Sequence, residues 1–233
     1  MRQLTVFFFL LPFIVEGQHS QIADSPGVDS IAAFYFANQG ETLAIHNGRV
    51  FLGYPGIVGD AFYPSTAFQK GSILFDGTWY HDVSIMYDIY QDDVILLHPG
   101  STPIRLFSGR IAQFSFDGLN FVRLNADKDH VLKPGFYQHL VEGNATILVH
   151  RSKKIEENIV DMRVERKFVS ATRYFILRDG AYHPIHRQKF LFDILKVNRQ
   201  AIIKHLKSQG IRYKDDQEKA IIAIAQYYNQ LRK

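Results

Sequence analysis

Tight-turn dipeptides divide the middle of this chain into short segments, and they constrain its fold more than any other feature. Asparagine or aspartate followed by glycine occurs four times between runs rich in β-branched and aromatic residues, at Asn47-Gly48, Asp76-Gly77, Asp117-Gly118 and Asp179-Gly180. These dipeptides accept the positive φ angles that two-residue hairpin turns require. Glu142-Gly143-Asn144 is a fifth turn of similar kind. The turns predict a mainly antiparallel β domain over residues 43–186.

Between the turns, side chains alternate with the period of a pleated strand. In residues 83–90 one face carries Val83, Ile85, Tyr87 and Ile89, and the other carries Ser84, Met86, Asp88 and Tyr90. The series of predicted strands continues at residues 94–97, 104–107, 111–116 and 119–124. Short sequential connections favour neighbouring antiparallel strands. We therefore predict an antiparallel β meander, which must curl into a partial barrel or pack against another element to hide its apolar face.

Two segments interrupt the strand pattern. Residues 54–71 are rich in proline and glycine and carry four aromatic side chains, which predicts a long loop that packs its own aromatics. Residues 153–167 are strongly charged and are interpreted as a connection with room for a helical turn.

After Pro184 the apolar residues take helical spacing. They occur at Phe190, Leu191, Ile194 and Leu195, and again at Ile202, Ile203 and Leu206. Asn198 is a predicted N-cap and Gly210 a predicted helix stop. The last helix is predicted to begin near Asp215-Asp216, because Asp215 and Glu218 have capping-box spacing. Its apolar stripe is Ile221, Ile224, Ala225, Tyr228 and Leu231. These patterns predict a C-terminal helical hairpin in residues 187–233, packed on the sheet or beside it, and an α+β fold class that is mainly β.

The N-terminal residues resemble a cleavable signal peptide. Arg2 supplies a positive charge, and residues 4–15 form an apolar run of 12 residues broken only by Pro12. A signal sequence has an apolar region of about 7–15 residues, whereas a bilayer-spanning helix needs about 20. The short residues Val15 and Gly17 predict cleavage after residue 17. We expect residues 18–42 to be the lead-in of an exported protein in the periplasm or at the cell surface; the alternative is a buried N-terminal strand or helix.

Charge and composition narrow the expected partners. The formal net charge of +4 and the pI of about 9.1 are interpreted as ordinary solubility charge, with the densest basic stretch at residues 151–154. The chain has no cysteine, which excludes disulfides, thiolate metal sites and a cysteine nucleophile. We expect an envelope partner (a polysaccharide, a lipid or a protein), no nucleic acid, and no transmembrane segment in the mature chain.

Two stretches carry a resemblance to known sequences. The first runs from Gly71-Ser72-Ile73-Leu74-Phe75-Asp76-Gly77 through Tyr80 and Val83 to Tyr87-Asp88-Ile89-Tyr90 and Asp93-Val94-Ile95. The second runs from Tyr174-Phe175-Ile176 through Gly180, Tyr182 and Pro184-Ile185 to the basic helix ending at Gly210. Together they resemble a group of uncharacterised, signal-bearing envelope proteins of Bacteroidetes-type bacteria. The resemblance implies export and a β sheet followed by helices, and it implies no catalytic residue.

Polar clusters that could carry catalysis or bind a metal are few. His183 and His186 flank Pro184-Ile185, but in a strand they point to opposite faces, so no metal site is predicted there. Gly-rich phosphate loops and serine-nucleophile motifs are absent from the sequence, and no cofactor is expected. One competing hypothesis is an envelope hydrolase that uses the polar groups near the 81–93 hairpin together with a histidine: His81, Asp82, Asp88 or His183. That hypothesis requires the groups to converge on one pocket.

Aromatic residues are concentrated in one third of the chain. The candidate ligand-binding residues are Tyr54, Phe62, Tyr63, Phe68, Trp79 and Tyr80. Exposed on a curved sheet, such rings stack on sugars or cover apolar ligands. The leading hypothesis is therefore an exported, non-catalytic binding or assembly protein of the cell envelope. An alternative within the binding class is a carrier of a lipid or lipoprotein, which requires a large apolar cavity.

Overall fold

The computed structural model describes residues 44–98, 100, 102–128, 130–160 and 162–232. The predicted signal peptide, residues 1–17, and the lead-in, residues 18–42, lie outside the described residues. The contacts divide the chain into residues 1–40 and 41–233, and the fold described below belongs to the second unit.

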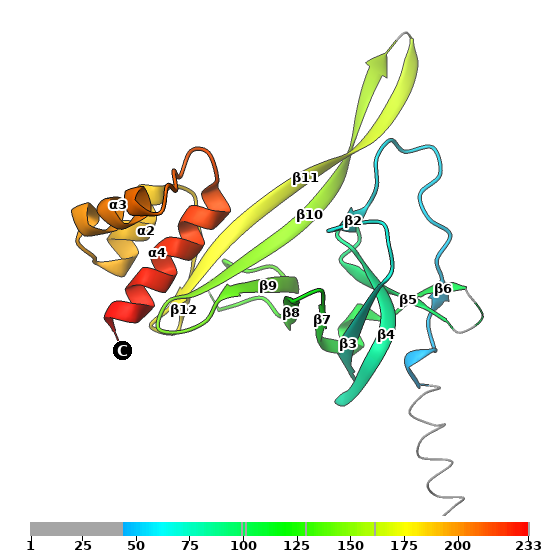
Figure 1. Ribbon diagram of the computed structural model, residues 1–233. Helices are drawn as coiled ribbons and strands as arrows, with labels where there is room; N and C mark the ends of the chain where they lie inside the picture. Colours follow the sequence, from blue (N-terminus) through cyan, green and yellow to red (C-terminus); the bar gives the residue numbers. More distant parts are fainter. Residues whose placement is uncertain (1–43, 99, 101, 129, 161, 233) are drawn as a thin grey trace, which may run out of the picture. The chain divides into compact units, whose positions relative to one another are not determined.

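The described strands form one open, mainly antiparallel sheet of twelve strands, followed by three helices (Figure 1). The strands are β1 (Arg49–Val50), β2 (Phe62–Tyr63), β3 (Gln69–Phe75), β4 (Thr78–Asp88), β5 (Asp93–Leu97), β6 (Pro103–Arg105), β7 (Ile111–Phe116), β8 (Leu119–Leu124), β9 (Gly135–Val141), β10 (Thr146–Val160), β11 (Arg163–Arg178) and β12 (Ala181–Ile185). Their order is β1-β6-β5-β4-β3-β7-β8-β9-β10-β11-β12, and β2 pairs with β4. The predicted fold class is confirmed.

Three of the four turn dipeptides form the predicted hairpins. Asp76-Gly77, Asp117-Gly118 and Asp179-Gly180 all have positive φ angles and join β3 to β4, β7 to β8 and β11 to β12. Asn47-Gly48 was predicted as a hairpin but instead follows a helical turn that ends in a bond from Asn47 N–H to the Ala44 carbonyl. A Cβ atom at Gly48 would lie 2.6 Å from the Arg105 carbonyl oxygen, so glycine serves close approach to β6 there.

The N-terminal part of the sheet curls tightly around an aromatic core. β4 and β9 are four strand steps apart, which a flat sheet would separate by about 19 Å at roughly 4.8 Å per step. The rings of Tyr87 on β4 and Phe136 on β9 are nevertheless only 6.0 Å apart. The core between them includes Phe75, Phe114 and Phe121, all fully buried. The sheet is therefore curled, as predicted, but it does not close.

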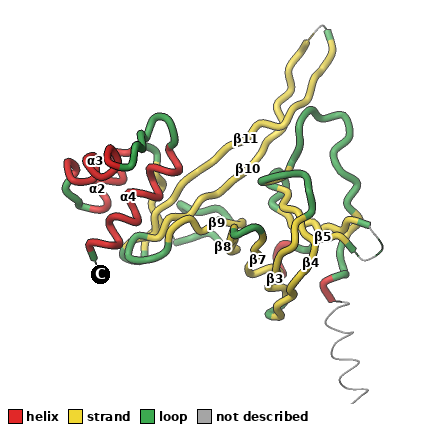
Figure 2. The backbone as a smooth tube through the Cα atoms, viewed as in Figure 1, coloured by secondary structure: helices red, strands yellow, loops and turns green. Residues whose placement is uncertain are grey.

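The longest hairpin is β10 and β11, whose far end extends beyond the rest of the sheet (Figures 1 and 2). We call residues 154–169 of this hairpin the arm. The predicted connection with a helical turn at 153–167 is wrong, because residues 153–160 and 163–167 are strands. Their charges match across the hairpin: Glu157 lies opposite Arg166, with the Arg166 Nε 2.8 Å from the carboxylate, and Glu156 lies opposite Lys167. Cross-strand ion pairs of this kind favour the strand register.

The C-terminal helices cover the other end of the sheet. They are α2 (Gln188–Leu195), α3 (Arg199–Ser208) and α4 (Gln217–Leu231). Their apolar residues form one cluster with buried residues of β9 to β12. This second core is mainly aliphatic and contains several alanines.

Most of the predicted helix signals are confirmed. The Asn198 side chain accepts bonds from the N–H groups of Gln200 and Ala201, and Gly210 follows α3 with φ 68°. The cap of α4 is Asp216 rather than the predicted Asp215, because Asp216 accepts from Lys219 N–H at 2.9 Å while Glu218 turns away toward β10. The predicted stripe of α4 is buried except for Leu231, which is 62% exposed. None of the helices in the described residues has the length and apolarity needed to cross a bilayer.

Candidate aromatic binding pocket

Residues 51–68 cover the outer face of β4, which explains why both faces of that strand are buried at its end. β2 lies in this segment and pairs with the end of β4, and the Ala61 carbonyl accepts a bond of 2.9 Å from Ile89 N–H. On the other side, Val58 exchanges two backbone bonds with β11: its N–H donates to Arg166 at 2.8 Å, and its carbonyl accepts from Phe168 at 3.0 Å. The segment is therefore held by β4 and by the base of the arm.

A cavity of about 240 Å³ lies beneath this segment. Its aromatic wall is formed by Phe51, Tyr54, Phe62, Phe68 and Phe168. Met86 contributes from β4, and Asp60 and two glycines also line the cavity. The walls are mostly apolar, so burying an apolar group there is favourable.

Edge-to-face ring contacts hold the wall of the pocket in place. Tyr54 is central: its ring centroid lies 5.6 Å from that of Phe51, 5.3 Å from Tyr90 and 5.5 Å from Phe168. Phe51 also meets Phe62 at 5.9 Å. Such contacts contribute about 0.5–1.5 kcal/mol each beyond burial. Four of the five rings of the wall, those of Phe51, Tyr54, Phe62 and Phe168, are therefore held by contacts with other rings of the protein.

A buried carboxylate anchors Tyr54 from below. The Tyr54 hydroxyl donates to Asp88, whose side chain is fully buried. The other Asp88 oxygen accepts from the N–H groups of Tyr90 at 2.9 Å and Gln91 at 3.1 Å. Burial and the Asp88 carboxylate raise the pKa of Tyr54 well above its usual value, so its hydroxyl keeps its proton. Tyr54 therefore acts as a neutral donor that positions the ring.

The neighbouring carboxylates are also engaged by the protein. Asp92 accepts from the Tyr87 hydroxyl at 2.5 Å and from Phe136 N–H at 3.0 Å. Asp93 accepts from the Ser108 hydroxyl, and its other oxygen lies 3.3 Å from the Arg105 Nε. Burial raises the pKa values of both carboxyl groups. The described donors thus engage both oxygens of each group, which is the arrangement of a structural turn rather than of a general base.

The groups of the hydrolase hypothesis are not brought together. The His81 ring bonds to the Ser72 hydroxyl at 2.9 Å and stacks on Trp79. Asp88 lies seven residues further along β4, roughly 23 Å away at about 3.3 Å per residue. His183 lies on β12, paired with Ile176 of β11. Within the described residues, no group of three or more His, Asp or Glu side chains is arranged to hold a metal ion.

Of the six predicted binding residues, three meet in the pocket: Tyr54, Phe62 and Phe68. Tyr63 instead packs its ring under the Arg151 guanidinium, 4.4 Å away. Trp79 is 43% exposed near the opposite end of β4, and Tyr80 packs against the aromatic core.

Sequence reasoning missed three other residues of the pocket wall: Phe51, Met86 and Phe168. Met86 was assigned to the correct strand face, and the alternation could have suggested that this face is covered. Phe168 is more than a hundred residues from Phe51 in sequence, and no local pattern signals that pairing.

Comparisons of the chain with protein-family models, with curated proteins and with solved structures found no match. The fold therefore defines only a structural class, an open and curled antiparallel sheet with three C-terminal helices. The resemblance to envelope proteins stays a prediction.

Proposed function

We propose that this chain is an exported, non-catalytic binding protein of the cell envelope, and that its aromatic pocket anchors a bulky apolar side chain of a protein partner. The pocket itself is the observation that carries the proposal. Its volume of about 240 Å³ is below the roughly 300–1,000 Å³ of pockets that enclose small-molecule ligands. A single side chain from a larger partner fits this size better.

Exposed apolar residues beside the pocket support a protein partner. Val50, Leu52 and Val58 are 61%, 87% and 56% exposed, and each is adjacent in sequence to a residue that lines the pocket. A filled pocket surrounded by apolar surface is the usual arrangement of a binding hot spot. A polysaccharide would need hydrogen-bonding groups beside the rings, whereas the Tyr54 hydroxyl is already bonded to Asp88.

The carrier and hydrolase alternatives have less support. The interior of the curled sheet is filled by rings such as Phe114 and Phe121, which are fully buried. The carboxylates near the hairpin are held by protein donors. Export is supported by the sequence of residues 1–17 alone, and N-terminal sequencing of the mature protein is expected to begin at Gln18.

Photo-crosslinking in the producing cells tests the proposed partner. A photoreactive amino acid at position 52 is expected to give one discrete protein adduct, and Phe68→Ala is expected to abolish it by removing part of the pocket wall. The same probe at Phe107, 40% exposed and outside the pocket lining, is the matched control. An adduct that forms equally from position 107, or that persists in Phe68→Ala, would contradict the proposal.

A further inference from the structure

A second and larger cleft lies at the fork where β12 leaves β11. Its volume is about 550 Å³, and its lining includes Thr172, Arg173, Tyr174 and Phe175 of β11, Ile185 at the end of β12, and Gln217 at the start of α4. The last β11–β12 pair is Tyr174 with Ile185, and the chain then turns away toward α2. The cleft therefore begins where β11 loses its neighbour.

The edge of β11 is unpaired over residues 169–173. On one side of this gap Val58 bonds to Arg166 and Phe168, and on the other side β12 pairs from Tyr174 onward. Within the described residues, positions 169–173 pair only with β10. At about 3.3 Å per residue, the gap is roughly 16 Å long.

The direction of the free backbone groups follows from the bonds beside the gap. The N–H and C=O of one strand residue point to the same side, and this side alternates along the strand. Arg166 and Phe168 direct theirs outward to Val58, and the pairing of β10 with β11 continues without a register shift. Ser170 and Thr172 therefore direct theirs outward as well, which presents two donors and two acceptors to a new strand.

Side chains from both faces of β11 line the cleft. Phe175 packs with Tyr137 and Leu148 in one cluster, whereas Tyr174 packs against the helical core. Because neighbouring residues of a strand point to opposite faces, a cleft that includes both wraps around the strand edge. An extended peptide, whose own side chains alternate, is the shape that contacts both faces.

Arg173 gives the cleft its charge. It is exposed, and in the described part of the chain its guanidinium forms no ion pair. Burial lowers the pKa of the nearby His150 ring, and the positive charges of Arg173 and Lys133 lower it further. The exposed Arg173 guanidinium, unpaired among the described residues, favours a negatively charged group on the partner.

We propose that this edge binds an extended peptide segment with alternating apolar and acidic side chains, which adds as a strand to β11 at residues 169–173 and places a carboxylate on Arg173. Ser170 and Thr172 supply the backbone bonds, and the cleft takes the apolar side chains. This site is separate from the aromatic pocket, and its occupation does not depend on the proposed function.

Fluorescence anisotropy with labelled pentapeptides tests the proposal on the mature protein. A blocked peptide of alternating valine and glutamate is expected to bind at least about tenfold more tightly than its valine–lysine counterpart. Arg173→Glu is expected to reverse that preference. In spectra of the ¹⁵N-labelled protein, the glutamate peptide is expected to shift the amide signals of Ser170 and Thr172.

Thr172→Pro separates strand addition from simple charge attraction. It removes an outward N–H without breaking a bond to β10, and it is expected to weaken binding by about tenfold or more. Thr172→Val keeps the N–H and is the matched control. Phe51→Ala in the aromatic pocket is expected to leave peptide binding unchanged.

Three results would overturn the proposal: no binding of the glutamate peptide, equal binding of both peptides, or unchanged binding by a folded Thr172→Pro variant. As a further control, the protein is titrated with octanoate, a free apolar carboxylate. Binding of octanoate at Arg173 without binding of the peptide would contradict the proposal, because the cleft would then recognise a free carboxylate.

Discussion

The strands from β3 to β9 and those from β9 to β12 belong to one sheet, yet the two halves hide their apolar faces differently. The N-terminal half curls on itself and fills its interior with rings, including Phe75, Phe114 and Phe121. The C-terminal half stays open and is covered by α2, α3 and α4 through aliphatic residues and alanines. A curled sheet needs large side chains to fill its interior, whereas alanine lets a helix approach a strand closely.

A cluster of residues around Arg151 is one of the contacts between the two halves. Arg151 of β10 donates to Gln138 at 2.8 Å and to both oxygens of Glu218 on α4, at 2.9 and 3.0 Å. Its guanidinium also lies over the ring of Tyr63 on β2. Tyr174 donates to the same Glu218 at 2.9 Å. Each half therefore has its own core, and the bonds of Arg151 help to couple the two halves.

The largest effect is expected from a deletion in the ring core. Phe114 is fully buried against Tyr87, Phe116, Phe121 and Phe136. Phe114→Ala is expected to lower the free energy of unfolding by about 3–5 kcal/mol. The only tryptophan, Trp79, lies on β4 and reports unfolding of this half by fluorescence. A loss below about 1 kcal/mol would contradict a rigid ring core.

The second effect concerns the joint between the halves. Arg151→Ala is expected to lower the free energy of unfolding by about 3 kcal/mol, since bonds to charged groups contribute roughly 1.5–3 kcal/mol each and buried Gln138 loses its partner. Trp79 fluorescence and helical circular dichroism are then expected to give separate urea transitions. Arg151→Lys is the control: it keeps the charge but has only one nitrogen to bond Gln138 and Glu218, and it is expected to lose less. Coincident transitions in Arg151→Ala would show that the coupling lies elsewhere.

The third effect is a dependence on pH within the N-terminal half. Burial raises the pKa of Asp92 in the folded state above 3.8, the ordinary value for an aspartate, which also applies to the unfolded chain. The folded state therefore binds more protons than the unfolded state between the two values, and stability falls as pH rises through that window. Asp92→Asn is expected to reduce the slope of stability against pH in this window. The reduction is less than about 1.4 kcal/mol per pH unit, which is the most that one titrating group contributes. Urea unfolding of both proteins between pH 3.5 and 7 measures it; a steeper decline in the variant would contradict the assignment.

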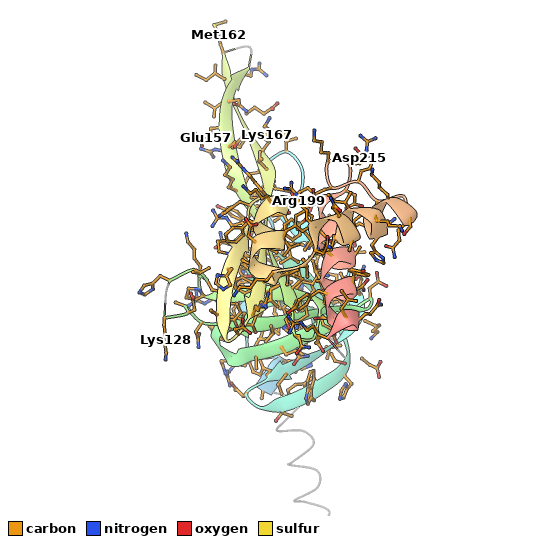
Figure 3. All side chains as sticks on the ribbon, turned by 90° about the vertical axis from the view of Figure 1, so that its left-hand side faces the viewer. Lys128, Glu157, Met162, Lys167, Arg199 and Asp215 are labelled. Carbon is orange, nitrogen blue, oxygen red and sulfur yellow. The ribbon has the colours of Figure 1, made fainter. Side chains whose placement is uncertain are left out.

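The smallest effect is expected at the end of the arm, outside both cores. Met162 is 98% exposed, and Figure 3 shows its side chain at the tip, beyond Glu157 and Lys167. Met162→Ser is expected to change the free energy of unfolding by less than about 0.5 kcal/mol. A larger loss in thermal or urea unfolding would mean that the arm tip is part of a packed core.

Local chemistry explains which parts of this fold could be predicted. Aspartate–glycine turns and two-residue alternation predicted β4 to β8 and the turn that joins β3 to β4, and Asn198 and Gly210 predicted the ends of α3. The arm was missed because its charges were interpreted as a solvated connection, and only the cross-strand pairing of Glu157 with Arg166 gives them a strand register. The pocket was half predicted, since Phe168 reaches Tyr54 through a contact that the sequence does not encode locally.

The central claim is tested most directly by titrating the ¹⁵N-labelled protein with N-acetyl-phenylalanine amide and following the backbone amide signals of the protein. This compound presents one bulky side chain by itself. The aromatic pocket is expected to respond through the signals of Phe51, Tyr54 and Phe168, with methyl glucoside causing no such shifts. Phe68→Ala is expected to weaken that response. Shifts that are absent from these three residues, or that methyl glucoside reproduces equally, would contradict the account.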